Sequence, residues 1–257
     1  MTIRHGLRLL QWCISAVIFL CAAATHAQQT LSVVVGYHKP PYVFGANDTG
    51  VELDIVRHIF KPLGYEIQPI YVPFGRTPSE LRNQRADIGL TLNKWHDINQ
   101  EWLTEPYIAY QNFAISLTKN NVEVSRIADL NSYSVVAFQS ATIVLGPEYA
   151  NAVKGRENYL ELPEQQRQVT LLLRGNLEVA VLDQNIFRYF YSIAEPELQG
   201  QAITYHSLFP KSPYAAAIPD VELREYFNQR LTTMFANGSY QALLDKYQLV
   251  DILHSAN

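Results

Sequence analysis

Residues 31–36, Leu-Ser-Val-Val-Val-Gly, begin the pattern that decides the fold. This run is short, apolar and rich in β-branched residues, and a glycine ends it, so it predicts a buried strand. The strand cannot continue through His38-Lys39-Pro40-Pro41-Tyr42, because proline has a fixed φ and no backbone N–H to donate. We therefore expect a rigid loop directly after the first strand.

Helices and strands alternate from there to residue 90. Apolar residues at helical spacing, or alternating with polar residues, mark each element. The predicted elements are a helix over 51–63, a strand over 67–72, a helix over 77–85 and a strand over 86–90. Thr77-Pro78-Ser79-Glu80 has the pattern of a capping box and begins the second helix. This order predicts an α/β fold with a mainly parallel sheet, in which ligands bind beside the loops after Gly36 and Leu90.

A second α/β unit follows. Its predicted elements are strands over 112–117, 134–138 and 178–182, a loop and helix over 140–151, and a helix over 163–173. Two more helices are predicted over 221–236 and 240–247, with Asn237-Gly238 as the break between them.

The composition narrows the functional classes. The 257 residues are 48% hydrophobic and 17% charged, with a formal net charge of −4. This hydrophobicity excludes a disordered chain, and the negative charge disfavours a nucleic-acid partner. The two cysteines, Cys13 and Cys21, lie near the N-terminus and cannot build a disulfide scaffold or metal site in the rest of the chain. The sequence has no zinc-binding histidine pair, Gly-x-Ser-x-Gly motif or nucleotide-binding glycine loop, so we expect no metal or cofactor.

The N-terminus has the pattern of a secretory signal peptide. Arg4 and Arg8 precede an apolar run over 9–24, and Ala27 lies at a suitable cleavage position. The run is shorter than the roughly 20 residues that span a bilayer, which favours a cleaved signal over 1–27 rather than a membrane anchor or a lipid on Cys21. We expect a periplasmic protein that is more acidic than the full chain, because the signal removes two arginines and no acid.

A motif near residue 50 resembles a known family. Gly50-Val51-Glu52-Leu53-Asp54-Ile55 is similar to the signature of the family 3 periplasmic solute-binding proteins, the amino-acid-type binders, with Val51 as a mild departure. Other segments resemble landmarks of that family in the same order: residues 40–44, 86–89, 104–107, 129–130, 135–139, 175–183 and 231–247. The resemblance spans essentially all of residues 31–249.

This resemblance implies a two-lobed, type II periplasmic-binding-protein fold with a hinge and an interlobe cleft. The implied division is lobe one over 28–117, lobe two over 118–206 and a return to lobe one over 207–257. It also implies a monomer without enzymatic activity that captures a small polar ligand for the membrane permease of an ABC importer. Two alternatives stay open: a binding protein that signals to a membrane sensor, and a periplasmic dehydratase resembling the cyclohexadienyl dehydratases, which need basic residues to clamp a dicarboxylate.

The resemblance further implies how the ligand is held. In this family an arginine of lobe one binds the ligand's α-carboxylate, and an aspartate of lobe two binds its ammonium. Asp183, eight residues after Gly175, matches the aspartate, although a residue that caps a strand-to-helix turn would look the same. The arginine is missing, and Asp97 or Asn99 stands in its place.

The missing arginine leaves two hypotheses about the ligand. In the first, Lys94 or Arg76 replaces the arginine and the ligand is an ordinary amino acid. In the second, the acids Asp97 and Asp183 favour an amine or another cationic ligand, because they repel a carboxylate.

Other candidate ligand-binding residues lie near the ends of the predicted strands. Aromatic residues that would stack on a ligand, or serve only in packing, are Tyr37, Tyr42, Phe44, Trp95 and Phe138. Thr91 and Asn93 are predicted polar groups of the cleft. Ser140 and Thr142 precede a helix, where they would hold an anionic group of the ligand or cap the helix.

Overall fold

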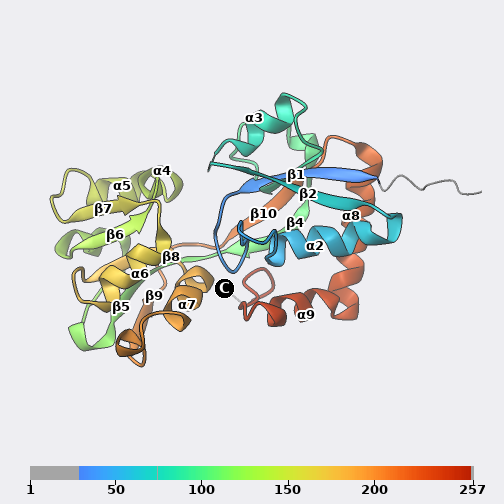
Figure 1. Ribbon diagram of the computed structural model, residues 1–257. Coiled ribbons are helices and arrows are strands. Elements are labelled where there is room, and N and C mark those ends of the chain that lie inside the picture. Colours follow the sequence, from blue (N-terminus) through green and yellow to red (C-terminus); the bar gives the residue numbers. More distant parts are fainter. Residues whose placement is uncertain (1–28, 74, 256–257) are drawn as a thin grey trace, which may run out of the picture.

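The computed structural model describes residues 29–73 and 75–255, which form two α/β lobes with a five-stranded sheet in each (Figure 1). The predicted signal peptide, residues 1–27, lies outside these residues. None of the helices in the described part of the chain has both the length and the hydrophobicity that crossing a membrane requires.

The sheet of the first lobe has the strand order β2-β1-β3-β10-β4. Its strands are β1 (Thr30–Gly36), β2 (Glu66–Val72), β3 (Ile88–Leu92), β4 (Leu103–Tyr110) and β10 (Ser212–Ala217). β1 is parallel to β2 and β3, whereas β10 is antiparallel to β3 and β4. The helices of this lobe are α2 (Val51–Phe60), α3 (Thr77–Arg82), α8 (Val221–Asn237) and α9 (Ser239–Lys246). Figure 1 shows α3 on one side of the sheet and the other three helices opposite.

The sheet of the second lobe has the order β7-β6-β8-β5-β9. Its strands are β5 (Asn112–Leu117), β6 (Val135–Phe138), β7 (Tyr159–Leu162), β8 (Val179–Asp183) and β9 (Ile203–His206). β6 is parallel to β7 and β8, and β5 is antiparallel to β8 and β9. The helices are α4 (Ala141–Val144), α5 (Pro147–Val153), α6 (Gln165–Leu173) and α7 (Gln184–Ser192). Short 3₁₀ helices are η1 (Lys61–Leu63), η2 (Gln100–Trp102), η3 (Thr118–Asn120), η4 (Ile127–Ser132) and η5 (Pro196–Leu198).

Both sheets are mixed: β1, β2 and β3, from which a mainly parallel sheet is predicted, do pair in parallel, but β10 and β5 each run antiparallel to their neighbours. The reason is the path of the chain. It leaves the first lobe through β4 and Gln111, and it returns through residues 207–211 into β10, which therefore runs against β3. The predicted lobe boundary at residue 117 also differs from the structure, because β5 pairs with β8 and β9 in the second sheet.

The predicted capping box at Thr77 does not form. Thr77 is the first residue of α3 and is buried, and the helix is preceded by Arg76, whose side chain makes no capping hydrogen bond. The helix ends at Arg82, three residues earlier than the sequence pattern predicts.

Gly50 sets where α2 begins relative to the loop after β1. Its φ of 124° is a conformation that side chains disfavour, and a Cβ there would collide with the carbonyl group of Tyr42. The absence of a side chain lets the amide of Glu52 donate to the carbonyl oxygen of Tyr42 at 3.2 Å. This contact places the first turn of α2, with Glu52, directly against the loop.

Contacts other than the two crossing segments also join the lobes. The ring of Phe44 packs edge-on against Tyr189 of α7, with 5.4 Å between centroids. Asn185 of α7 exchanges two hydrogen bonds with the backbone of Val250, which follows α9. The segment that follows α9 accordingly lies beside α7 in Figure 1.

Candidate functional site

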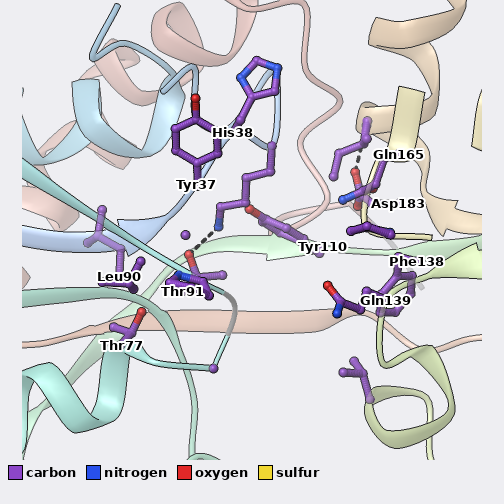
Figure 2. Close-up of a pocket in the computed structure, with 18 of the residues that line it drawn as sticks. Tyr37, His38, Thr77, Leu90, Thr91, Tyr110, Phe138, Gln139, Gln165 and Asp183 are labelled. Carbon is purple, nitrogen blue, oxygen red and sulfur yellow. Dashed lines mark hydrogen bonds between the residues drawn. The ribbon is translucent and has the colours of Figure 1, made fainter. Parts of the chain in front are cut away.

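A cleft of about 620 Å³ lies between the two lobes. The first lobe contributes the loop 36–39 after β1 and residues 90–92 at the end of β3. The second lobe contributes residues 138–139 after β6, residues 163–166 around the start of α6, and Asp183 at the end of β8. Figure 2 shows Leu90 and Thr91 on one side, Gln139 and Asp183 on the other, and Tyr110 between them. Because parallel strands of both lobes end here, the cleft lies where the strand order predicts a ligand site.

An ion pair joins Lys39, which lines the cleft, to Glu52, which is buried behind the first-lobe wall. Nζ of Lys39 is 2.8 Å from Oε1 of Glu52 and donates to Oγ1 of Thr91 at 2.7 Å. Glu52 is fully buried and accepts three more hydrogen bonds, from the hydroxyls of Thr91, Tyr107 and Tyr110. Burial opposes the charge of Glu52, but the Lys39 ammonium and the hydrogen bonds outweigh it, and the pKa of Glu52 is lowered. The pair is ionised and carries no net charge.

The hydroxyl groups around Glu52 remain protonated. Burial, together with the charge of Glu52, raises the pKa of Tyr107 and of Tyr110 well above the ordinary value for tyrosine. Both hydroxyls therefore act as donors to the carboxylate over the whole physiological pH range, at 2.5 Å each.

Tyr110 connects this cluster to the second lobe. Its ring stacks on that of Tyr42, with the centroids 3.9 Å apart. The hydroxyl of Tyr42 donates to Oδ1 of Asp183 at 3.1 Å and accepts a hydrogen bond from Nδ2 of Asn185. Tyr42 is fully buried and is not part of the cleft surface, so its place is behind the wall rather than against a ligand.

Asp183 both caps a helix and faces the cleft. Its Oδ1 accepts the amides of Asn185 and Ile186 at the start of α7, and its Oδ2 accepts the amide of Gln111 at 2.9 Å. Burial raises the pKa of Asp183 to about 6, even though these amides and Tyr42 favour the charged form. Oδ2 thus has one protein donor among the described residues, and Asp183 lines the cleft although only 3% of its surface is exposed.

Several predicted site residues lie away from the cleft surface. Asp97 is 92% exposed and pairs with Arg82 at 2.8 Å. Lys94 lies over the ring of Trp95, 4.8 Å from its centroid, and is exposed. Asn93 holds the turn after β3 through His96 and the amide of Trp95. None of these three predicted residues lines the cleft, and the same holds for Arg76, Phe44 and Trp95.

The amides of Ser140 and Thr142 already bind an anion from the same chain. Oε2 of Glu161 accepts the amide of Ser140 at 2.7 Å, and Oε1 accepts the amide and the hydroxyl of Thr142, each at 2.9 Å. Burial opposes this charge, but the hydrogen bonds outweigh it and lower the pKa of Glu161. The anionic group expected from a ligand at this place is therefore an internal carboxylate.

The structure brings Thr91, Phe138, Tyr37 and Asp183 to the cleft from the predicted set. Sequence reasoning missed Lys39, although it lies in a loop that the strand order places at the site. It also missed Tyr110 and a group of polar residues on the second-lobe side. Within the described residues, Lys39 is the only lysine or arginine that lines the cleft, and the acids are Glu164 and Asp183. Two histidines line it as well, His38 and His96, and burial lowers the pKa of His96.

Two α/β lobes joined by crossing segments, with a ligand-sized cleft at their strand ends, define a ligand-binding protein of the periplasmic type. The family model "Bacterial extracellular solute-binding proteins, family 3" matches residues 31–250, and the chain belongs to this family. A search of curated proteins found no match.

Solved structures share this fold. The ligand-binding core of GluR0 in complex with L-glutamate has a TM-score of 0.69 at 16% identity, and the similarity covers 86% of this chain and 99% of that one. An ancestral arginine-binding protein bound to arginine has a TM-score of 0.67 at 18% identity, with 86% and 99% covered. A histidine kinase sensor domain with similarity to periplasmic binding proteins has a TM-score of 0.65 at 18% identity, with 86% and 96% covered.

Proposed function

We propose that this protein captures a small amine-bearing ligand in its interlobe cleft and delivers it to an ABC importer. The observation that carries this function is the Asp183 carboxylate at the cleft, whose Oδ2 has one protein donor among the described residues. The cleft volume of about 620 Å³ is in the range of small-molecule sites. Export to the periplasm, action as a monomer and the absence of enzymatic activity belong to the same proposal, which the family membership supports.

The charges of the cleft favour an amine over a dicarboxylate or a simple acid. Glu164 and Asp183 face it, and the only lysine or arginine on its described surface is already paired with Glu52. The amides of Ser140 and Thr142 are occupied by Glu161. A carboxylate would therefore meet acids and no available cation, which also argues against a dehydratase that clamps a dicarboxylate.

Matched pairs of amines and amino acids test this function. Agmatine and L-arginine share a side chain and differ in the α-carboxylate, as do cadaverine and L-lysine. We expect agmatine and cadaverine to raise the melting temperature at least as much as their amino-acid partners, and native mass spectrometry to show an amine retained from the cell. Stabilisation by amino acids alone would reject the amine ligand.

Signalling to a membrane sensor is a second candidate, favoured by the similarity to a histidine kinase sensor domain. Both functions use the same ligand and the same cleft. Genes for a permease and an ATPase beside this gene would support import, and a sensor gene in their place would support signalling.

A further inference from the structure

Lys39 lines the cleft and is the only lysine or arginine on its described surface, yet its charge is already paired within the protein. Its side chain is only 14% exposed, and its ammonium contacts Oε1 of Glu52 at 2.8 Å and Oγ1 of Thr91 at 2.7 Å. The ring of Tyr110 lies 5.1 Å from the same nitrogen. Two of the three N–H donors are used within the protein, and the ring flanks the group.

Glu52 is the reason for this arrangement. Its carboxylate is fully buried and held by four groups, so it can neither rotate toward water nor exchange its partner for a ligand. Gly50 fixes the start of α2 against the loop that carries Lys39. Both ends of the ion pair are thus set by backbone that is packed in place.

We infer that Glu52 is a specificity-determining residue, which selects ligands without a carboxylate by neutralising Lys39 and holding it against the first-lobe wall. Glu52 does not line the cleft, so it acts through Lys39 as a positioning residue. The inference rests on the proposed function, because it explains why the same cleft takes an amine through Asp183. It predicts that a substitution of Glu52, although this residue does not line the cleft, reverses the preference between amine and amino acid.

Two substitutions with opposite expected effects on ligand preference test the inference. Glu52→Gln keeps the size of the side chain and an oxygen that accepts from the tyrosine hydroxyls, but leaves Lys39 with an uncompensated positive charge. The affinity for L-arginine relative to agmatine is expected to rise about tenfold, which corresponds to about 1.4 kcal/mol. Lys39→Gln removes the cation that neutralises Glu52, so the affinity for L-arginine relative to agmatine is expected to fall.

Isothermal titration calorimetry with agmatine and L-arginine measures the ratio for the wild type and each variant. Asp97→Asn is the matched control, since it removes an exposed acid that lies outside the cleft. Its ratio is expected to equal that of the wild type within twofold. A merely structural role for Glu52 would weaken both ligands equally and leave the ratio unchanged, and that result would overturn the inference. If Glu52→Gln does not fold, the direction of the change in Lys39→Gln decides, and no change or a rise in its ratio overturns it.

Failure of the proposed function gives a different result. If the wild type binds neither agmatine nor L-arginine, that function is rejected, and succinate becomes the probe. A gain of succinate binding in Glu52→Gln over the wild type would still support the role of Glu52, and the absence of a gain would overturn it.

Discussion

Lowering the pH from 7 to 5 should weaken amine binding, because it neutralises Asp183. Burial raises the pKa of this carboxyl to about 6, from an ordinary value of 3.8. The ionised fraction is then about nine-tenths at pH 7 and about one-tenth at pH 5, while agmatine stays cationic throughout. If only the ionised carboxylate binds the amine, the affinity for agmatine falls about tenfold over these two pH units.

Asp183 should also make the stability of the ligand-free protein depend on pH, but in the opposite direction to agmatine affinity. A folded-state pKa above the ordinary value means that the folded state binds the proton more tightly than the unfolded state. The contribution of Asp183 to the free energy of unfolding is therefore fully present below about pH 4 and is lost as the pH rises through about 6. At about 1.4 kcal/mol per unit, the shift of Asp183 corresponds to about 3 kcal/mol.

Calorimetric titration of agmatine at pH 5, 6 and 7 measures the first effect, and urea denaturation over the same range measures the second. Asp183→Asn is the control for both, because it should bind agmatine weakly and lose the part of each pH response that comes from Asp183. Tyr42 and Tyr214 are also close to Asp183, but burial raises the pKa of each, so they stay neutral over this range. An agmatine affinity that falls as steeply with pH in Asp183→Asn as in the wild type would refute the role given to Asp183.

Three further substitutions test the surrounding structure. Gly50→Ala should destabilise the fold by about 3 kcal/mol or more, since a Cβ there meets the Tyr42 carbonyl at a positive φ; a normal urea midpoint would contradict the described start of α2. Tyr42→Phe removes a donor to Asp183 and should cost about 1–3 kcal/mol, while raising the pH midpoint of agmatine binding; an unchanged midpoint would argue against that hydrogen bond. Glu161→Gln should lower stability by about 1–2 kcal/mol, with agmatine affinity kept within twofold. A large loss of affinity in that variant would place Glu161 in the ligand site.

Local sequence patterns predict most of the first half of the fold. The strand predicted over 31–36 forms within one residue of its bounds, and the helix predicted over 51–63 forms as α2 over 51–60 followed by the 3₁₀ helix η1 over 61–63, because both depend on spacing along the chain. β4 and β10 are not visible in this way. Pro106 and Pro213 interrupt their apolar pattern, and these strands form because they pair with each other across about a hundred residues of sequence.

The site is harder to predict, because residues that are close in sequence can have side chains that face different parts of the structure. Thr91 faces the cleft, whereas Lys94 and Asp97 follow a turn whose hydrogen bonds, centred on Asn93, carry them away from it. Ser140 depends on Glu161, a partner on another strand that no local pattern reveals. Lys39 could have been found from its place in the first strand-end loop, but its pairing with Glu52 required the structure.

The hydrogen bonds between Asn185 and Val250 have a mechanical consequence. Two covalent connections alone would let the lobes both hinge and twist about each other. The segment after α9 adds a third, breakable attachment, so the lobes can rotate without losing it only along a restricted path. Opening beyond that path would cost about 1–3 kcal/mol for two hydrogen bonds. The segment after α9 therefore limits how far the two lobes can open in the absence of ligand.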